Sequence, residues 1–214
     1  MKMYDIAFRM ASFLACRVGL EENRVDTVRF GLEIILGEVI KWAILLFAAA
    51  IFEVLPGALL AMVSVFVFRM LSGGAHCEDY WRCLTFGVIT FLGFGKLGIY
   101  LEPYITHSIV AKFILSGTVV MVILTAIWAP GEVPNRKIST GERAKFKKIS
   151  LVFLVIWAAI MVFLILPHHI PAVVTGLLAL IVQAFSFTPP GYWAIDRFDF
   201  ALSRIMGERR CSHA

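Results

Sequence analysis

The chain has 214 residues, of which 60% are hydrophobic and only 16% are charged. Soluble globular domains carry about 25% charged residues, so this composition excludes an ordinary soluble domain and indicates an integral membrane protein. The net charge of +5 comes from basic residues between apolar runs, where orientation in the membrane explains it, and nucleic acid is not expected as a partner.

Charged residues separate long apolar runs and do not alternate with apolar residues, which favours helices over a β-barrel. We expect an all-α fold: a polytopic membrane helical bundle of about six transmembrane helices, preceded by N-terminal amphipathic interfacial helices. Residues 1–214 are expected to form a single integral membrane domain. It comprises the amphipathic helices (1–37), the six-span bundle (38–188) and a cytoplasmic tail (189–214).

The first two segments are amphipathic. Residues 2–18 place Ile6 and Phe13 on one helical face, Gly19 is a plausible stop, and a second pattern begins at Asn23. These segments are typical of interfacial helices, and an ordinary cap over the bundle is favoured over a substrate-binding role. No cleaved signal peptide is expected, because charged residues interrupt the N-terminal segment.

Six apolar runs follow, with expected spans at residues 39–52, 58–71, 84–101, 108–129, 151–166 and 172–187. The turns after the first, third and fifth spans contain no Lys or Arg, whereas the segments after the second and fourth are basic. The positive-inside rule therefore predicts a multi-pass protein of the cell membrane with both termini, and the segment between the second and third spans, in the cytoplasm.

That segment, residues 69–83, is a polar stretch between apolar runs. Its His76 and Cys83 suggest a base and a nucleophile, since a thiolate attacks carbonyl groups and an imidazole accepts a proton near neutral pH. On a continuous helix their spacing of seven would separate the Cα atoms by about 10 Å. The chain must therefore bend near these two residues, and Gly73-Gly74, just before His76, permits a bend.

One arrangement makes Asp79 the N-cap of the third span and leaves Cys83 in the first helical turns, where the helix dipole favours a thiolate. Arg69 and Arg82 would add positive charge, and backbone N–H groups at Gly73 and Gly74 would bind an oxyanion. The alternative remains open at this point, because Cys is commonly a buried apolar residue and His is often a plain interfacial residue.

The order Arg69, Gly73-Gly74-Ala75-His76 and Cys83 resembles the signature of the accessory gene regulator B (AgrB) family. The stretches 30–33 and 129–132 are also similar to that family, so the resemblance covers most of the chain in order. It implies a membrane cysteine endopeptidase that processes quorum-sensing pro-peptides, with His76 and Cys83 catalytic and Cys77 a bystander.

The implied reaction is attack of Cys83 on a carbonyl of an AgrD-like precursor, departure of the C-terminal part, and ring closure by the precursor's own Cys or Ser to a thiolactone or lactone. The resemblance also implies that the basic run between the fourth and fifth spans attracts an acidic substrate. Its candidate residues are Arg136, Lys137, Arg143, Lys145, Lys147 and Lys148. An orientation-setting loop near anionic lipid is the favoured explanation of this run.

No metal or other cofactor is expected, because His168-His169 lack companion ligands with suitable spacing. Gln183 is expected to make an interhelical hydrogen bond. Two other functions stay open: a small-molecule or peptide transporter with Lys96, Lys112 and Gln183 on a polar path, and a membrane thiol oxidoreductase with Cys77 and Cys83 as a redox pair. Besides the precursor and the lipid bilayer, a homodimer partner is possible.

Overall fold

The structure is a computed structural model that describes residues 3–19, 22–75, 77, 79–131 and 139–205. These residues form eight α-helices with one short 3-10 and one π segment, and no strand lies among them. The expectation of an all-α protein is confirmed. The chain divides into two compact units, residues 1–47 and 48–214, and each is described by itself.

The N-terminal unit consists of α1 (Met3–Val18) and most of α2 (Glu22–Ile51). α2 is one continuous helix of 30 residues, without a break at the boundary expected between residues 37 and 38. The expected first span is therefore the second half of a longer helix. Ion pairs one helical turn apart line its first half, with Arg29 bonded to Asp26 and to Glu33, both at 3.0 Å.

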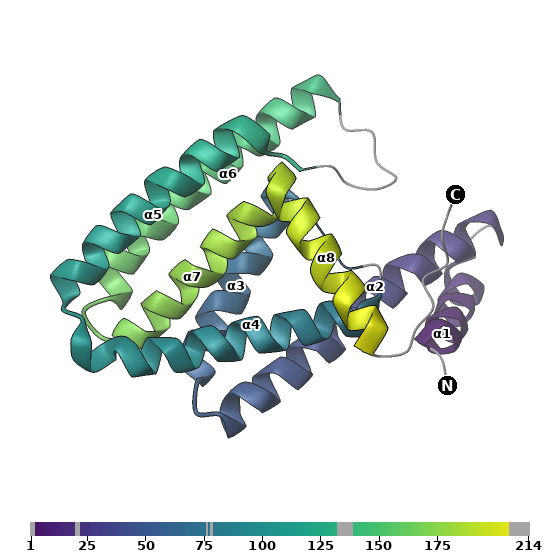
Figure 1. The fold of residues 1–214 in the computed structure, drawn as a ribbon. Coiled ribbons are helices and arrows are strands. Elements are labelled where there is room, and N and C mark those ends of the chain that lie inside the picture. Colours follow the sequence, from purple (N-terminus) through teal and green to yellow (C-terminus); the bar gives the residue numbers. More distant parts are fainter. Residues whose placement is uncertain (1–2, 20–21, 76, 78, 132–138, 206–214) are drawn as a thin grey trace. The chain divides into compact units, whose positions relative to one another are not determined.

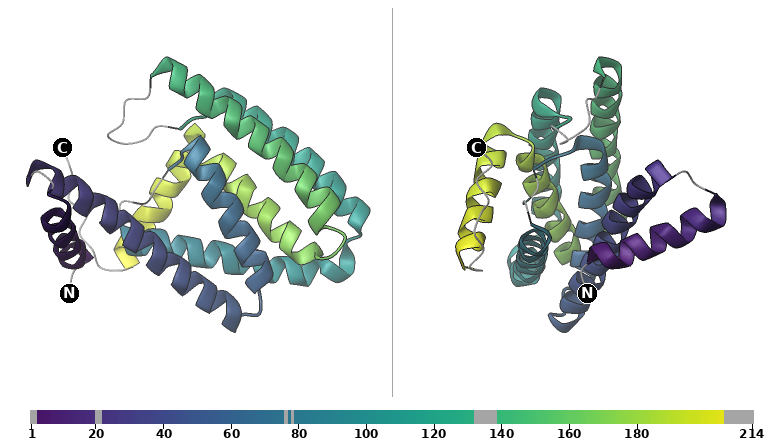
Figure 2. Two further views of the ribbon diagram at one scale, coloured as in Figure 1. Left: turned by 180° about the vertical axis from the view of Figure 1, so that it is seen from behind. Right: turned by 90° about the vertical axis from the view of Figure 1, so that its right-hand side faces the viewer.

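The second unit contains the remaining helices, which are α3 (Leu55–Ser72), α4 (Tyr80–Leu101), the 3-10 turn η1 (Glu102–Tyr104), α5 (His107–Trp128), α6 (Thr140–Ile160) with its π extension η2 (Met161–Ile165), α7 (Ile170–Ser186) and α8 (Pro189–Ile205). α7 is central and packs against α3, α4 and α5, while α5 and α6 run side by side (Figures 1 and 2).

Small residues allow α7 to approach its neighbours closely. A Cβ atom on Gly57 of α3 would lie 2.8 Å from Thr175 Oγ1, and one on Gly98 of α4 would lie 2.7 Å from the Pro171 carbonyl oxygen. Close backbone approach at small residues is a common way for membrane helices to associate, because lipid provides no hydrophobic drive between them. The glycines thus place α7 against both α3 and α4.

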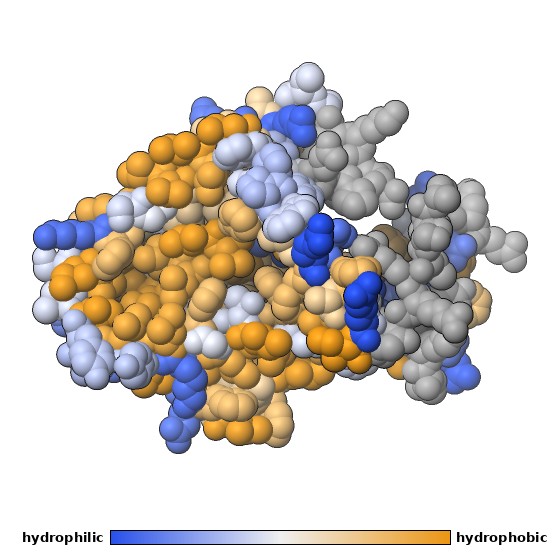
Figure 3. Space-filling model, in the orientation of Figure 1, coloured by the Kyte–Doolittle hydropathy of each residue, from blue (hydrophilic) through white to orange (hydrophobic). Residues whose placement is uncertain are grey.

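Five helices, α2 to α6, are long and apolar enough to cross a membrane, and the α7–α8 pair, bent by 100°, brings the total to as many as six. Large hydrophobic side chains such as Phe113, Val155 and Phe163 are exposed on the outside of the unit, and apolar residues cover much of the visible face (Figure 3). A surface of this kind belongs in lipid. The chain is a multi-pass membrane protein.

Candidate functional site

The helix break predicted from Gly73-Gly74 is confirmed. α3 ends at Ser72, and the two glycines follow with φ of 69° and 139°, backbone conformations that favour glycine. The Gly73 N–H donates to the Arg69 carbonyl at 2.9 Å and is therefore engaged within the turn, and Gly74 is buried. His76 lies outside the described residues.

Arg69 and Gln183 hold this α3–α4 turn on α7. The Arg69 guanidinium donates to the Ala75 carbonyl and, at 3.3 Å, to Gln183 Oε1, while Gln183 Nε2 donates to the Gly73 carbonyl at 2.8 Å. The Ala75 N–H donates to the Ser186 carbonyl at 3.3 Å. The expected interhelical hydrogen bond of Gln183 is thereby confirmed, and it fixes the backbone that leads into His76.

The predicted N-cap of α4 is also confirmed. Asp79 has extended backbone angles, and its carboxylate accepts hydrogen bonds from the N–H groups of Trp81 at 2.8 Å and Arg82 at 3.4 Å. The Cys83 N–H then makes a helical bond to the Asp79 carbonyl at 3.1 Å. Cys83 therefore lies in the first turn of α4, half-buried, where the helix dipole favours negative charge.

A buried ion pair fastens this first turn to α8. Arg82 Nη1 lies 2.7 Å from Asp199 Oδ2 and 3.2 Å from the Asp199 carbonyl oxygen, and the two side chains are 7% and 2% exposed. One turn further along, the rings of Phe86 and Phe198 meet edge to face at 5.0 Å. Asp199 neutralises the positive charge that Arg82 was expected to add near Cys83.

Asp199 is not among the residues predicted for the site, because residues 189–214 are expected to form a cytoplasmic tail, whereas residues 189–205 form α8. A signal was present in the chain. Pro189-Pro190 suits the start of a helix, and Phe198 and Asp199 recur with the helical spacing from Ile195. Arg82 inside a membrane helix also calls for a partner, since an unpaired buried charge is costly.

Cys77 lies between the turn and α4, and both it and Cys83 are reduced thiols. Its hydrogen bond with Cys83, its burial and the nearby charges of Cys83 and Asp199 together raise the pKa of Cys77 well above that of an ordinary thiol. Cys77 therefore keeps its proton at neutral pH.

The basic run differs from the expected loop. Arg136 and Lys137 lie outside the described residues, whereas Arg143, Lys145, Lys147 and Lys148 lie on the first turns of α6. The helix begins early because Ser139 and Glu142 form a capping box, in which each side chain accepts a backbone hydrogen bond from the other residue. The basic side chains are thus carried on a helix.

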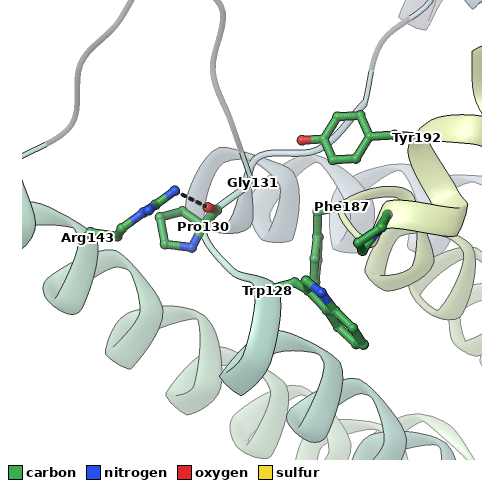
Figure 4. A pocket seen from close by; sticks show the side chains of 7 residues that line it. Trp128, Pro130, Gly131, Arg143, Phe187 and Tyr192 are labelled. Atoms are coloured by element: carbon green, nitrogen blue, oxygen red, sulfur yellow. Dashed lines mark hydrogen bonds between the residues drawn. The ribbon is translucent and has the colours of Figure 1, made fainter.

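A pocket of about 360 Å³ opens between the ends of α5 and α7 and the starts of α6 and α8. Its lining residues are Trp128, Pro130, Gly131, Arg143, Phe187, Pro189 and Tyr192, and all but Pro189 are labelled in Figure 4. The Gly131 N–H donates to the Ser72 carbonyl at 2.8 Å, which joins the pocket to the α3–α4 turn. Within the described ranges, no group of three or more His, Cys, Asp or Glu side chains is placed to hold a metal ion.

The sequence is similar to one known protein family and to two of its relatives. The family model described as accessory gene regulator B matches residues 7–187. An AgrB-like protein of Clostridium beijerinckii is 28% identical over 64% of this chain and 66% of its own length, just under two thirds. AgrB-like protein 2 of Clostridium perfringens (strain 13 / Type A) is 25% identical over 77% of this chain and 78% of its own.

No solved structure gives a significant match. The family model covers far more than half of the chain, including the whole 69–83 segment and all of the helices from α2 to α7. The chain therefore belongs to the AgrB family.

Proposed function

We propose that this protein is a membrane-embedded cysteine endopeptidase that cleaves the C-terminal part from an AgrD-like pro-peptide and cyclises the remainder for quorum sensing. The observation that carries the proposal is the position of Cys83. It lies in the first turn of an N-capped helix that begins at Tyr80, after the Gly73-Gly74 turn. This is an environment in which a thiolate is stabilised.

In the proposed reaction His76 removes the Cys83 thiol proton, and the thiolate sulfur attacks a precursor carbonyl carbon. The C–N bond then breaks, His76 returns the proton to the leaving amine, and an acyl-enzyme remains on Cys83. The Gly74 N–H is the proposed donor to the oxyanion, and Arg69 acts indirectly by holding the turn.

A Cys or Ser side chain of the precursor then loses its proton and attacks the thioester carbonyl carbon. The bond between that carbon and the Cys83 sulfur breaks, the thiolactone or lactone is released, and the Cys83 sulfur recovers a proton. Water must be kept from the thioester until the ring closes. The state of Cys77 supports this assignment. Its pKa is raised, first of all by its interaction with Cys83, so Cys77 keeps its proton at neutral pH. Cys83 is the thiol proposed to ionise.

The basic residues at the start of α6, Arg143, Lys145, Lys147 and Lys148, together with Arg136 and Lys137, are proposed to attract an acidic part of the substrate. Three of the α6 side chains are exposed, and Lys147 donates to the Ala126 carbonyl at 2.8 Å. Such attraction depends on ionic strength. Precursor binding should weaken as salt is raised, and charge reversal of these residues should remove the salt dependence.

One observation favours a second candidate, a membrane thiol oxidoreductase. Cys83 is the first cause of the raised pKa of Cys77, so the two thiols are near each other. A transporter, the other alternative, has no comparable support, since Gln183 is engaged by Arg69 and the Gly73 carbonyl.

A homodimer remains a prediction, as does the placement of the termini and the catalytic site in the cytoplasm.

The test reconstitutes the protein in liposomes with a synthetic AgrD-like precursor and follows the cleaved products by mass spectrometry. Cys83→Ala and His76→Gln should insert normally but cleave nothing, while Cys77→Ala should cleave. Cleavage of the precursor by the Cys83→Ala protein would contradict the proposal. Repeated formation and reduction of a Cys77–Cys83 disulfide, without cleavage of the precursor, would favour the oxidoreductase.

A further inference from the structure

We infer that the pocket beside the α3–α4 turn is a specificity site that binds one bulky apolar side chain of the precursor next to a carboxylate of the same peptide. This inference rests on the proposed function and names the substrate feature that the enzyme would select. It concerns residues of α5, α6 and α8 that lie outside the 69–83 segment.

The walls of the pocket are mainly aromatic. Trp128, Phe187 and Tyr192 supply the rings, and Pro130 and Pro189 add further apolar surface. Tyr192 comes from α8 and Trp128 from the end of α5, and their side chains lie on different sides of the opening (Figure 4). A volume of about 360 Å³ is at the small end for ligand sites. It suits one large apolar side chain better than a length of peptide.

The guanidinium of Arg143 places a positive charge at one edge of the pocket. Arg143 lies across the pocket from Tyr192, and its Nη2 donates to the Pro130 carbonyl at 3.5 Å, which directs the guanidinium along the rim (Figure 4). None of the ion pairs within the described part of the chain involves Arg143. A guanidinium pairs best with a carboxylate, which it can bind through two parallel hydrogen bonds. The residue that fills the pocket should therefore have an acidic neighbour.

The pocket is connected to the proposed catalytic turn through backbone atoms. Besides the bond from the Gly131 N–H to the Ser72 carbonyl, a Cβ atom on Gly131 would lie 3.2 Å from the Gly74 nitrogen and 2.9 Å from Tyr192 Oη. Gly131 thus touches both the pocket wall and the turn. A peptide with one side chain in the pocket would have its neighbouring backbone beside Gly74, where the oxyanion is proposed to form.

The experiment uses photo-crosslinking to Cys83→Ala protein in liposomes, so that binding is read without cleavage. The probe is a synthetic precursor peptide carrying benzoylphenylalanine followed by Asp, and a second peptide has Lys in place of Asp. Crosslinks mapped by mass spectrometry should fall on residues 128–131 and 187–192. The Lys peptide should crosslink about tenfold less, which is the scale of one lost charged contact.

Two variants sharpen the result. Arg143→Glu should reverse the preference between the Asp and Lys peptides, and Trp128→Ala should lower crosslinking of both. Arg204→Glu is the matched charge control, because it lies twelve residues beyond Tyr192 on α8, about 18 Å along the helix, and is exposed. Trp193→Ala is the matched aromatic control, because Trp193 is 62% exposed and does not line the pocket. Neither control should change the crosslinking.

The pocket assignment and the peptidase function are tested by different results. Crosslinks elsewhere, or an Asp preference that survives Arg143→Glu, would overturn the pocket assignment even if wild-type protein cleaves the precursor. Crosslinks in the pocket, with a peptide preference that reverses in Arg143→Glu, would support the pocket assignment even if wild-type protein cleaves nothing. In that second case the proposed peptidase function fails and the peptide-binding site stands.

Discussion

Arg82 and Asp199 form a buried pair that joins the first turn of α4 to α8, and its loss should be costly. Removing one member of a buried ion pair leaves an uncompensated charge and costs about 3–5 kcal/mol. Asp199→Ala should therefore lower the free energy of unfolding by about that amount. The double variant Arg82→Met with Asp199→Leu should recover most of it. Unfolding titrations in detergent measure the stability of both variants. An Asp199→Ala protein as stable as the wild type would contradict the role of the ion pair.

Cys77 and Cys83 should differ in how their reactivity depends on pH. Because the pKa of Cys77 is raised, chiefly by its hydrogen bond with Cys83 and then by burial, its thiolate should appear only at more alkaline pH than that of an ordinary thiol. Iodoacetamide labelling read site by site should therefore modify Cys77 last as the pH rises. Cys83→Ala removes the largest cause and should move Cys77 labelling to lower pH. The exposed Cys16 serves as the internal reference for the reagent.

At the scale of elements, the α3–α4 turn depends on Gly74. Its φ of 139° suits glycine, and an added Cβ would lie 2.6 Å from Ser186 Oγ and 3.0 Å from Gln183 Nε2. Backbone strain of this kind costs about 1–3 kcal/mol, and it would act on the residues that lead to His76. Gly74→Ala should lower precursor cleavage by tenfold or more, which corresponds to about 1.4 kcal/mol.

Gly141→Ala is the matched control for that change. A Cβ at Gly141 meets nothing within 4 Å, and the residue lies in the first turn of α6. This variant should cleave the precursor at the wild-type rate. Equal activities of the Gly74→Ala and Gly141→Ala proteins would show that the turn is not needed in its observed conformation.

Local chemistry accounts for the elements that could be predicted from the sequence. Gly73-Gly74 ends α3, the Asp79 carboxylate caps α4, and hydropathy separates the spans, since each of these signals acts within a few residues. Asp199 could not be placed in this way, because its contact with Arg82 joins positions 117 residues apart. The start of α6 was missed although the capping box at Ser139 and Glu142 was readable.

At the scale of the whole molecule, the distribution of Lys and Arg predicts which ends of the helices face the cytoplasm. Tyr104, after α4, is 70% exposed and belongs to a turn predicted to be outside, whereas Cys16 on α1 is predicted to be inside. A membrane-impermeant maleimide should label Tyr104→Cys in intact cells and Cys16 only after permeabilisation. Labelling of Cys16 in intact cells would reverse the predicted orientation.

The central claim is that Cys83 carries the precursor as a thioester, and intact-mass spectrometry tests it most directly. The substrate is an AgrD-like precursor whose ring-closing Cys or Ser is replaced by Ala, so that the acyl group cannot leave by cyclisation. Wild-type protein should gain the mass of the precursor's N-terminal fragment, and fragmentation should place that mass on Cys83. An adduct on Cys77, or cleavage of the native precursor with no adduct at either thiol, would contradict the claim.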